Sequence, residues 1–226
     1  MATTIVPPGA ARPHRPAACL RPPGQDLRIE AIRAGQQGRD ELEAYVRDAF
    51  ARKHGAEVWS FMPTLLAFRD RHDSLRGVAG IRGAHEERLY LEQYLDRPIE
   101  QALAAAVASR DGRPGALNSV RRDSIVEVGN LAGASCRAAV RMVAQLPAYL
   151  MAQRYTWIVF TATSALRQIL AGFGAPLLEL GCADPDRLAG TRDAWGRYYE
   201  TDPRVYAGFL RDTELLAGFA RGGTDH

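Results

Sequence analysis

A succession of strand, helix, strand, helix and strand in the second half of the chain constrains its fold most. The runs Ser124 to Val128, Trp157 to Thr161 and Pro176 to Leu180 have the length and apolar content of buried strands. Between them, residues 136 to 154 and 164 to 174 carry apolar side chains at helical spacing. Strands that alternate with helices form sheets that are at least partly parallel, so the pattern predicts an α/β domain with both helices packed on the sheet.

The first half of the chain predicts a helix followed by a hairpin. Residues 40 to 52 carry one apolar stripe at helical spacing, formed by Leu42, Tyr45, Val46, Ala49 and Phe50. Two apolar runs, Thr64 to Phe68 and Gly77 to Arg82, flank the charged segment Arg69 to Ser74. This arrangement indicates two antiparallel strands joined by a solvated loop.

Local signals place the remaining elements. Pro98 precedes an alanine-rich segment from Ile99 to Ser109, which predicts a helix, and the glycines and proline within Arg110 to Asn118 predict a loop. Leu89 to Leu95 fits neither the helical nor the strand period. Ser164 is the expected cap of the last helix.

The two ends of the chain differ from its centre. Residues 1 to 26 hold six prolines beside small residues and arginines, a composition that predicts a disordered leader. We expect a single domain over residues 27 to 215, with an aromatic-rich C-terminal segment, and a flexible tail over residues 216 to 226. In that segment Trp195, Tyr198 and Tyr199 lie within five residues, and they line an acyl or acceptor pocket, clamp a disordered tail onto the core or bury a dimer contact.

Composition excludes several classes of protein. With 226 residues and 46% hydrophobic content the chain can build a real core, and a net charge of +3 is not that of a dedicated nucleic-acid binder. No apolar run approaches the roughly 20 residues of a membrane-spanning helix. Three scattered cysteines and five isolated histidines give neither a disulfide framework nor metal-ligand spacing, so we expect a cytoplasmic protein without a metal.

The order of the elements resembles the layout of GNAT acyltransferases, and four segments resemble the thermostable hemolysin family. These segments are Tyr90 to Leu95, Ile125 to Leu131, Val159 to Thr163 and Trp195 to Pro203. The resemblance implies a GNAT-like acyl-CoA N-acyltransferase fold with a central mixed sheet flanked by helices. It also implies a donor that is a thioester of coenzyme A or of an acyl carrier protein, and a small-molecule amine as acceptor.

The same segments are distantly similar to acyl-homoserine-lactone synthases. Those enzymes carry a Glu-x-Ser-Arg-Phe sequence on the corresponding strand, where this chain has Glu127-Val128-Gly129-Asn130-Leu131. The glutamate matches and the arginine does not. Because the glutamate is shared, an alternative function is that of an autoinducer-synthase-like enzyme that uses S-adenosylmethionine.

Glu127 is the candidate general base. Acyl transfer to an amine needs a group that accepts a proton from the attacking nitrogen, and partial burial among Ile125, Val126 and Val128 would raise the pKa of this carboxyl toward neutrality. The alternative is a strand glutamate paired with Arg121, Arg122 or another arginine at an edge. Asn130 either orients a carbonyl or a water, or is a turn residue.

The turn after this strand is the candidate cofactor site. GNAT enzymes place a Gln/Arg-x-x-Gly-x-Gly/Ala motif there, and the segment Asn130 to Ser135 resembles a degenerate version that matches at Gly133. Backbone groups of the splayed strand would contact the pantetheine arm, and the amides that begin the next helix would contact the pyrophosphate. The predicted cofactor-binding residues are Val128, Gly129, Leu131, Gly133, Ala134, Ser135 and Arg137.

Three further functional hypotheses use other features of the chain. The family name suggests a membrane-active lytic protein, which needs an exposed amphipathic element, whereas the stripes of these helices have the ordinary width of core-facing ones. A GNAT-shaped scaffold without catalysis is another alternative. Cys136 near a helix start suggests a nucleophile, but no histidine lies near it in the sequence.

Overall fold

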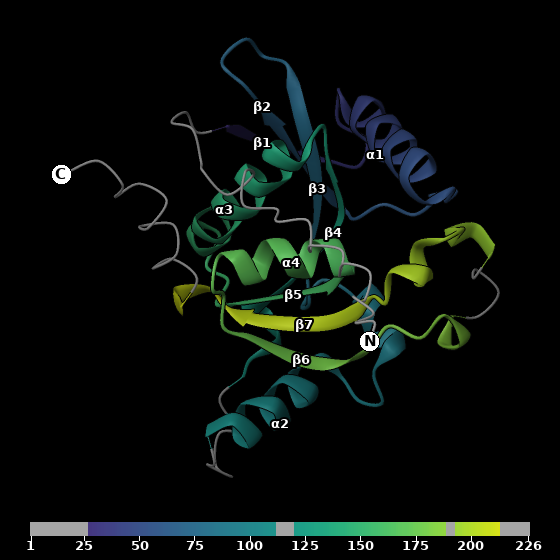
Figure 1. The fold of residues 1–226 in the computed structure, drawn as a ribbon. Helices are drawn as coiled ribbons and strands as arrows, with labels where there is room; N and C mark the ends of the chain where they lie inside the picture. The colour runs from purple at the N-terminus through teal and green to yellow at the C-terminus, as the bar shows by residue number, and fades with distance from the viewer. Residues whose placement is uncertain (1–26, 112–119, 189–192, 213–226) are drawn as a thin grey trace, which may run out of the picture.

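Seven strands form one mixed sheet at the centre of the molecule (Figure 1). The computed structural model describes residues 27–111, 120–188 and 193–212. The order across the sheet is β1-β2-β3-β4-β5-β7-β6. The strands are β1 Arg28–Arg33, β2 Thr64–Arg69, β3 Leu75–Gly83, β4 Ile125–Gly133, β5 Trp157–Ala162, β6 Leu177–Cys182 and β7 Arg204–Phe209.

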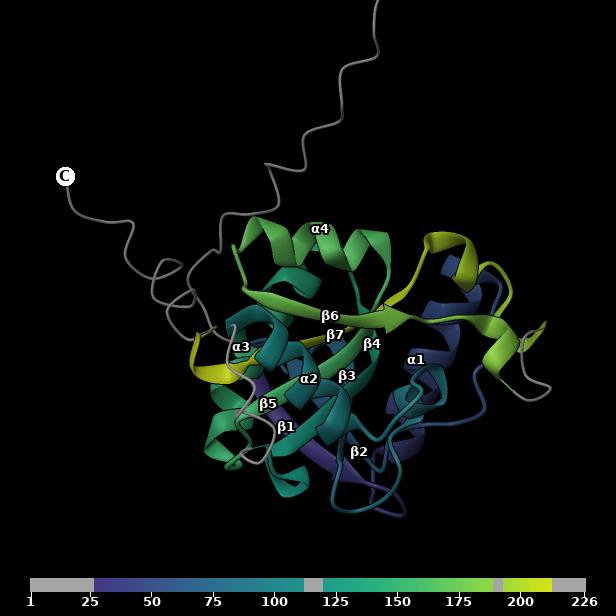
Figure 2. The same ribbon diagram turned by 90° about the horizontal axis from the view of Figure 1, so that it is seen from below.

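In the described part of the chain, four α-helices cover the two faces of the sheet (Figures 1 and 2). They are α1 Arg39–His54, α2 Ile99–Asp111, α3 Cys136–Ala152 and α4 Ser164–Gly172. Alternate strand residues divide between the faces: Val126 packs with α3 and α4, whereas Ile125 packs with α2. On the face that carries α2, α1 packs through Leu42 and Val46 against β2 and β3. The sheet therefore separates α1 and α2 from α3 and α4.

The helix, the hairpin and the alternating strands and helices predicted from the sequence are confirmed. β2 and β3 pair antiparallel, and β4, α3, β5, α4 and β6 follow in the expected order. The segment from Leu89 to Leu95, which fitted neither period, forms the 3-10 helix η2, Tyr90–Tyr94. The predicted central mixed sheet flanked by helices is the observed architecture.

Several details of the prediction are wrong. Strands β1 and β7 were not predicted, and β7 inserts antiparallel between β5 and β6, so that the single parallel pair in the described sheet is β4 with β5. Thr163, rather than Ser164, caps α4 by accepting the amide N–H of Leu166. Arg110 is helical rather than part of a loop. The predictions for residues 1–26 and 216–226, and the loop prediction for residues 112–118, lie outside the described residues.

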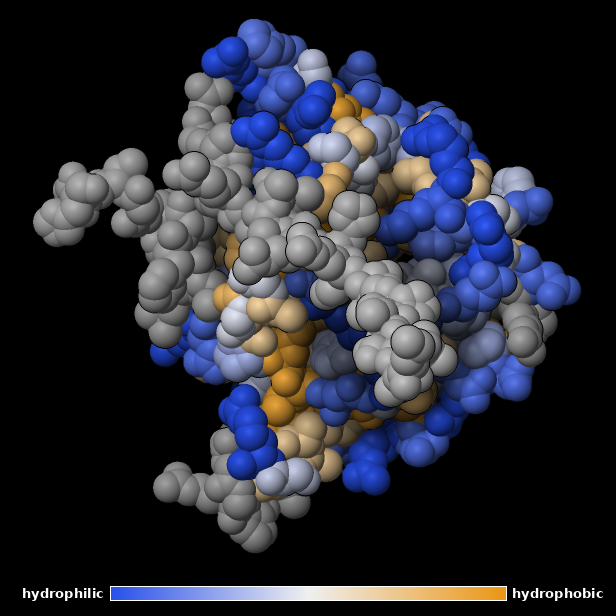
Figure 3. Space-filling model, viewed as in Figure 1, coloured by the Kyte–Doolittle hydropathy of each residue, from blue (hydrophilic) through white to orange (hydrophobic). Residues whose placement is uncertain are grey.

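Some apolar side chains reach the surface. Figure 3 shows them gathered over β6, between β7 and α2, on an otherwise largely hydrophilic face. Within the described ranges, no helix has the length and apolar character needed to cross a bilayer. The same residues contain no cluster of three or more histidine, cysteine or acidic side chains that could hold a metal ion.

Candidate functional site

The sheet splits between β4 and β5. Their parallel pairing runs from Ile125, opposite Trp157, to Val128, opposite Phe160, and no further. Beyond that point β4 continues to Gly133 paired with β3, and β5 continues to Ala162 paired with β7. The two strands therefore diverge, and within the described residues no strand pairs with the two backbone edges that face each other across the opening, which leaves them able to bind an extended ligand.

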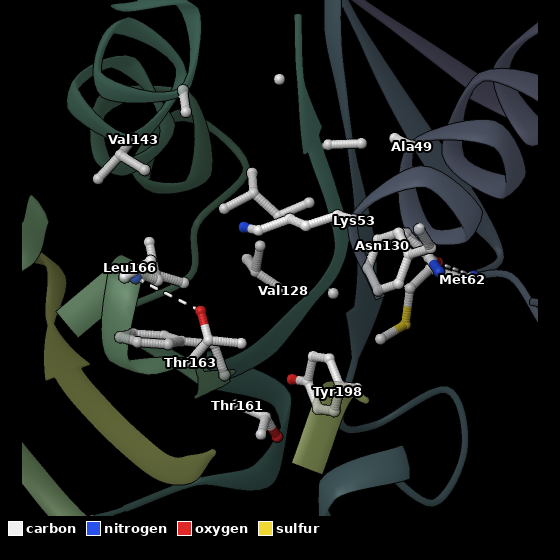
Figure 4. Close-up of a pocket in the computed structure, with 18 of the residues that line it drawn as sticks. Ala49, Lys53, Met62, Val128, Asn130, Val143, Thr161, Thr163, Leu166 and Tyr198 are labelled. Atoms are coloured by element: carbon white, nitrogen blue, oxygen red, sulfur yellow. Dashed lines mark hydrogen bonds between the residues drawn. The ribbon is translucent and has the colours of Figure 1, made fainter. Parts of the chain in front are cut away.

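A β-bulge lies on the β4 side of the opening. Asn130 and Leu131 together occupy the space opposite the single residue Ala79 of β3, and Asn130 has a positive φ of 46°. Its Oδ1 accepts the amide N–H of Met62 at 2.8 Å, which ties the segment after α1 to the strand (Figure 4). The bulge bends β4 away from β5. Asn130 thus plays the local structural role that the sequence left open beside a catalytic one.

A cavity of about 830 Å³ extends through the opening from one face of the sheet to the other. On the α3 and α4 face its walls are apolar, and Val143 and Leu166 face it from different helices (Figure 4). We call this part the apolar chamber; its lining residues include Val143, Leu146, Pro147, Leu166, Ile169, Leu170 and Phe173. The volume lies in the range of small-molecule sites.

The apolar chamber explains why α4 carries an apolar stripe that is not buried in the core. The stripe of Leu166, Ile169, Leu170 and Phe173 that predicted this helix is apolar, yet no residue of α4 is buried. All four side chains line the cavity instead. The helix therefore presents to a ligand the face that a core would otherwise cover.

On the α1 and α2 face the cavity has aromatic and polar walls. We call this part the aromatic chamber; its lining residues include Phe50, Lys53, His54, Arg82, Tyr90, Tyr94, Glu127, Trp195 and Tyr198. Burial raises the pKa of Tyr198, which keeps its hydroxyl protonated at neutral pH. In Figure 4 this hydroxyl points toward Thr161, at the end of β5.

The aromatic-rich segment lines the cavity, which is one of its three predicted roles, and it also packs on α1. The Tyr198 ring lies 5.3 Å from that of His54, and Arg197 donates its amide N–H to the carbonyl of His54 at 2.8 Å. Gly196 has a positive φ of 51°, and a Cβ there would lie 2.4 Å from the same carbonyl oxygen. Only glycine permits this approach.

Glu127 lies on the same face as the aromatic chamber. The residue is 3% exposed, and its two carboxylate oxygens accept the amide N–H groups of Tyr90 at 2.8 Å and Leu91 at 2.9 Å. Burial raises the pKa of this carboxyl to about 7, against the opposing effect of the two N–H donors. Arg121 pairs with Asp123, and Arg122 with Glu92 and Glu100, so neither forms the alternative pairing. Arg82 lies opposite Glu127 on β3, and its charge lowers the pKa of the carboxyl without offsetting the effect of burial.

Eight of the nine predicted site residues line the cavity. They are Glu127, Val128, Gly129, Asn130, Leu131, Gly133, Ala134 and Ser135. Arg137 is not among the lining residues and is exposed on the first turn of α3.

The predicted phosphate turn is wrong in part. Residues 130 to 133 belong to β4, so that only Ala134 and Ser135 connect the strand to α3. Ser135 caps α3 by accepting the amide N–H of Ala138 at 3.2 Å. A Cβ on Gly133 would lie 3.0 Å from the backbone nitrogen of Ala139, so this glycine lets the helix approach the strand end.

Sequence reasoning missed the contribution of α1. Its stripe predicted core packing, and Leu42 and Val46 are indeed buried, but Phe50 lines the cavity. Lys53 was also missed, although it is the only lysine in a chain whose other basic residues are arginines. In Figure 4 its ammonium group points from α1 into the cavity, toward Val128.

The split sheet, the bulged β4 and the helix that begins beside them define a GNAT-like acyltransferase fold. The model of the thermostable hemolysin family matches residues 32–213. The chain belongs to this family. A search of curated proteins finds no match.

Solved structures share the fold at low sequence identity. One is BjaI, a CoA-dependent acyl-homoserine lactone synthase with SAM and isopentyl-CoA, with a TM-score of 0.55, 11% identity, and coverage of 88% of this chain and 91% of BjaI. The AHL synthase LasI has a TM-score of 0.54 and 11% identity over 86% of this chain and 95% of LasI. FeeM, an N-acyl amino acid synthase from uncultured soil microbes, has a TM-score of 0.51 and 15% identity over 85% and 97%.

Proposed function

We propose that this protein is an acyltransferase that moves an acyl group from a thioester of coenzyme A or of an acyl carrier protein to a small-molecule amine. The observation that carries the proposal is the opening between β4 and β5, because it joins an apolar chamber to an aromatic and polar one. A thioester arm in the opening would hydrogen-bond the strand edges, while its acyl chain entered the apolar chamber. The functional unit would be the domain of residues 27 to 215.

The charged end of the donor would lie at the start of α3. Ser135 and Cys136 line the cavity, and α3 is 17 residues long, so its first amides and its dipole favour an anion there. Arg137 follows on the first turn and is exposed. A phosphate at this position would thus meet backbone N–H groups, with a guanidinium within the same turn.

Glu127 would accept the proton in the reaction. The amine nitrogen attacks the thioester carbonyl carbon, the C–N bond forms and the C–S bond breaks. The nitrogen gives its proton to the Glu127 carboxylate, directly or through a water, and the thiolate leaves and takes a proton from solvent. A carboxyl whose pKa is raised to about 7 is deprotonated in part at neutral pH and is a stronger base than an ordinary glutamate.

Chain-length dependence of donor binding tests this proposal. We expect calorimetric titration with acyl-CoA thioesters of increasing chain length to show a Kd that falls about fourfold for each CH₂ buried, until the apolar chamber is full. Ile169→Trp, which fills the chamber, should shift the preference to shorter chains. Gln168→Trp, on the exposed side of the same helix and outside the lining, is the matched control.

Two results would count against the proposal. One is that neither acyl-CoA nor acyl carrier protein binds at any chain length. The other is that binding occurs with the same Kd for free coenzyme A and for every acyl-CoA, since the apolar chamber would then not hold the acyl group.

A further inference from the structure

Lys53 places a positive charge within the cavity. It lies in the last turn of α1, lines the cavity and points toward Val128, the last residue at which β4 pairs with β5 (Figure 4). Most of the surrounding wall is aromatic or apolar. A cation directed at the point where the strands part therefore faces the place where the thioester carbonyl would lie.

The charge of Lys53 is available to a ligand. Among the described residues its ammonium group makes no ion pair and no hydrogen bond. Two other charged residues of the lining have partners in the protein: Arg82 pairs with Glu87 at 2.9 Å and acts on Glu127 through its charge, and Glu127 accepts two backbone N–H groups. An ammonium group beside apolar walls gains most from an anionic partner, because water screens the pair less there than in bulk solvent.

The position of Lys53 assigns this anion to the acceptor rather than to the donor. The start of α3 and the apolar chamber lie on the other face of the sheet from α1. The phosphates and the acyl chain of the donor would be accommodated on that side. The aromatic chamber, with Lys53 and Glu127 in its wall, remains for the molecule that attacks the thioester.

We propose that the acceptor is an amino acid, or a closely related amine with a carboxylate beside the amine, and that Lys53 binds this carboxylate. The proposal rests on the acyltransferase function above and names its substrate class. Lys53 points at the start of the opening, so the acid group it binds must lie close to the attacking nitrogen. An α-amino acid carries both groups on one carbon, which brings the amine to Glu127 and the carboxylate to Lys53.

Matched acceptor pairs test the proposal. Phenylalanine and leucine are compared with 2-phenylethylamine and 3-methylbutylamine, which lack the carboxylate. We expect the wild type to prefer the amino acids through KM, and Lys53→Met to raise KM for the amino acids about 10- to 100-fold while leaving the amines unchanged. Lys53→Arg should retain much of the preference. Arg141→Met, which removes a cation of α3 outside the cavity lining, should match the wild type.

A binding measurement gives a readout that does not need turnover. Because the chain has one lysine, reductive ¹³C-methylation labels Lys53 and the N-terminal amine alone, and methylation keeps the charge. We expect the Lys53 methyl resonance to shift on titration with phenylalanine or leucine and not with the two amines. That result supports the proposal even where a suitable donor for turnover has not been found.

Three outcomes would overturn the proposal. The wild type could acylate both members of each pair with equal KM, which leaves the acyltransferase function intact and removes the carboxylate requirement. The preference for amino acids could persist in Lys53→Met. Lys53→Met could instead weaken binding of free coenzyme A with no effect on the acceptor, which would assign the cation to the phosphates of the donor. A separate measurement tests the acyltransferase function itself: if the wild type binds no thioester, that function is wrong.

Discussion

Glu127→Gln is expected to lower kcat for acyl transfer by about 10²- to 10⁴-fold. The variant keeps the size of the side chain and loses the group that accepts the proton from the amine. In the wild type, kcat should rise as the pH passes about 7, because burial raises the pKa of Glu127 to about 7 and the deprotonated form is the base. In Glu127→Gln this inflection should be absent.

A stability measurement separates the chemical role of Glu127 from its structural one. Its carboxylate also accepts the N–H groups of Tyr90 and Leu91, so the substitution disturbs η2. The folded pKa lies above the usual 4.5, so the protonated group stabilises the wild type below about pH 4.5, and this contribution is lost as the pH rises through about 7. Urea unfolding of Glu127→Gln should lack this decline. A variant that keeps wild-type kcat and the same pH profile would contradict the assignment of Glu127 as the base.

Arg122→Met is expected to lower the free energy of unfolding by about 3 kcal/mol, near the lower end of the range for a broken buried ion pair. Arg122 bonds the Glu92 carboxylate at 2.7 Å, and the side chain of Glu92 is 4% exposed. The substitution would leave a buried carboxylate without its cation. The effect lies at the lower end because 30% of the Arg122 side chain is exposed and water can replace part of the interaction.

Arg121 provides a matched control for this prediction. It pairs with Asp123, and the two side chains are 78% and 50% exposed, so Arg121→Met should change the free energy of unfolding by less than about 1 kcal/mol. Both variants are measured by urea unfolding at neutral pH. Equal, small losses in the two would contradict a buried role for the Arg122 and Glu92 pair.

The Glu92 pair also supports the candidate site. The Glu92 carboxylate accepts the amide N–H groups of Leu89 and Ile99, both at 2.8 Å, and thereby ties η2 to the start of α2. The same 3-10 helix provides the two N–H donors of Glu127. Arg122→Met should therefore disturb the surroundings of the proposed base as well as the stability of the fold.

Local patterns were enough to predict most elements, and long-range pairing was not. Apolar runs and helical spacing indicated β2, β3, α1 to α4 and the strand and helix alternation, because these signals depend on residues close in the chain. The insertion of β7 between β5 and β6 depends on partners distant in sequence. The length of β4 was underestimated because the bulge at Asn130 interrupts its alternation.

The residues of the candidate site also divide into those that a local pattern predicted and those brought there by distant parts of the chain. The eight predicted residues from Glu127 to Ser135, which do not include Ala132, are close in the chain and line one cavity, whereas Arg137 just beyond them does not. Lys53 and Phe50 come from α1, and nothing in the spacing of that helix tells a cavity wall from a core contact. The same ambiguity applies to the apolar stripe on α4. Periodicity shows that one face of a helix is apolar, but it does not show whether other parts of the protein or a ligand cover that face.

A crystal structure of the protein with a thioether analogue of a medium-chain acyl-CoA, which cannot be cleaved, would locate the donor. We expect density for the arm between residues 129–133 of β4 and Thr161 to Thr163, with the acyl chain between α3 and α4 and the phosphates at the start of α3. Density for the analogue elsewhere on the protein, with the opening between β4 and β5 closed or empty, would contradict the proposed donor site.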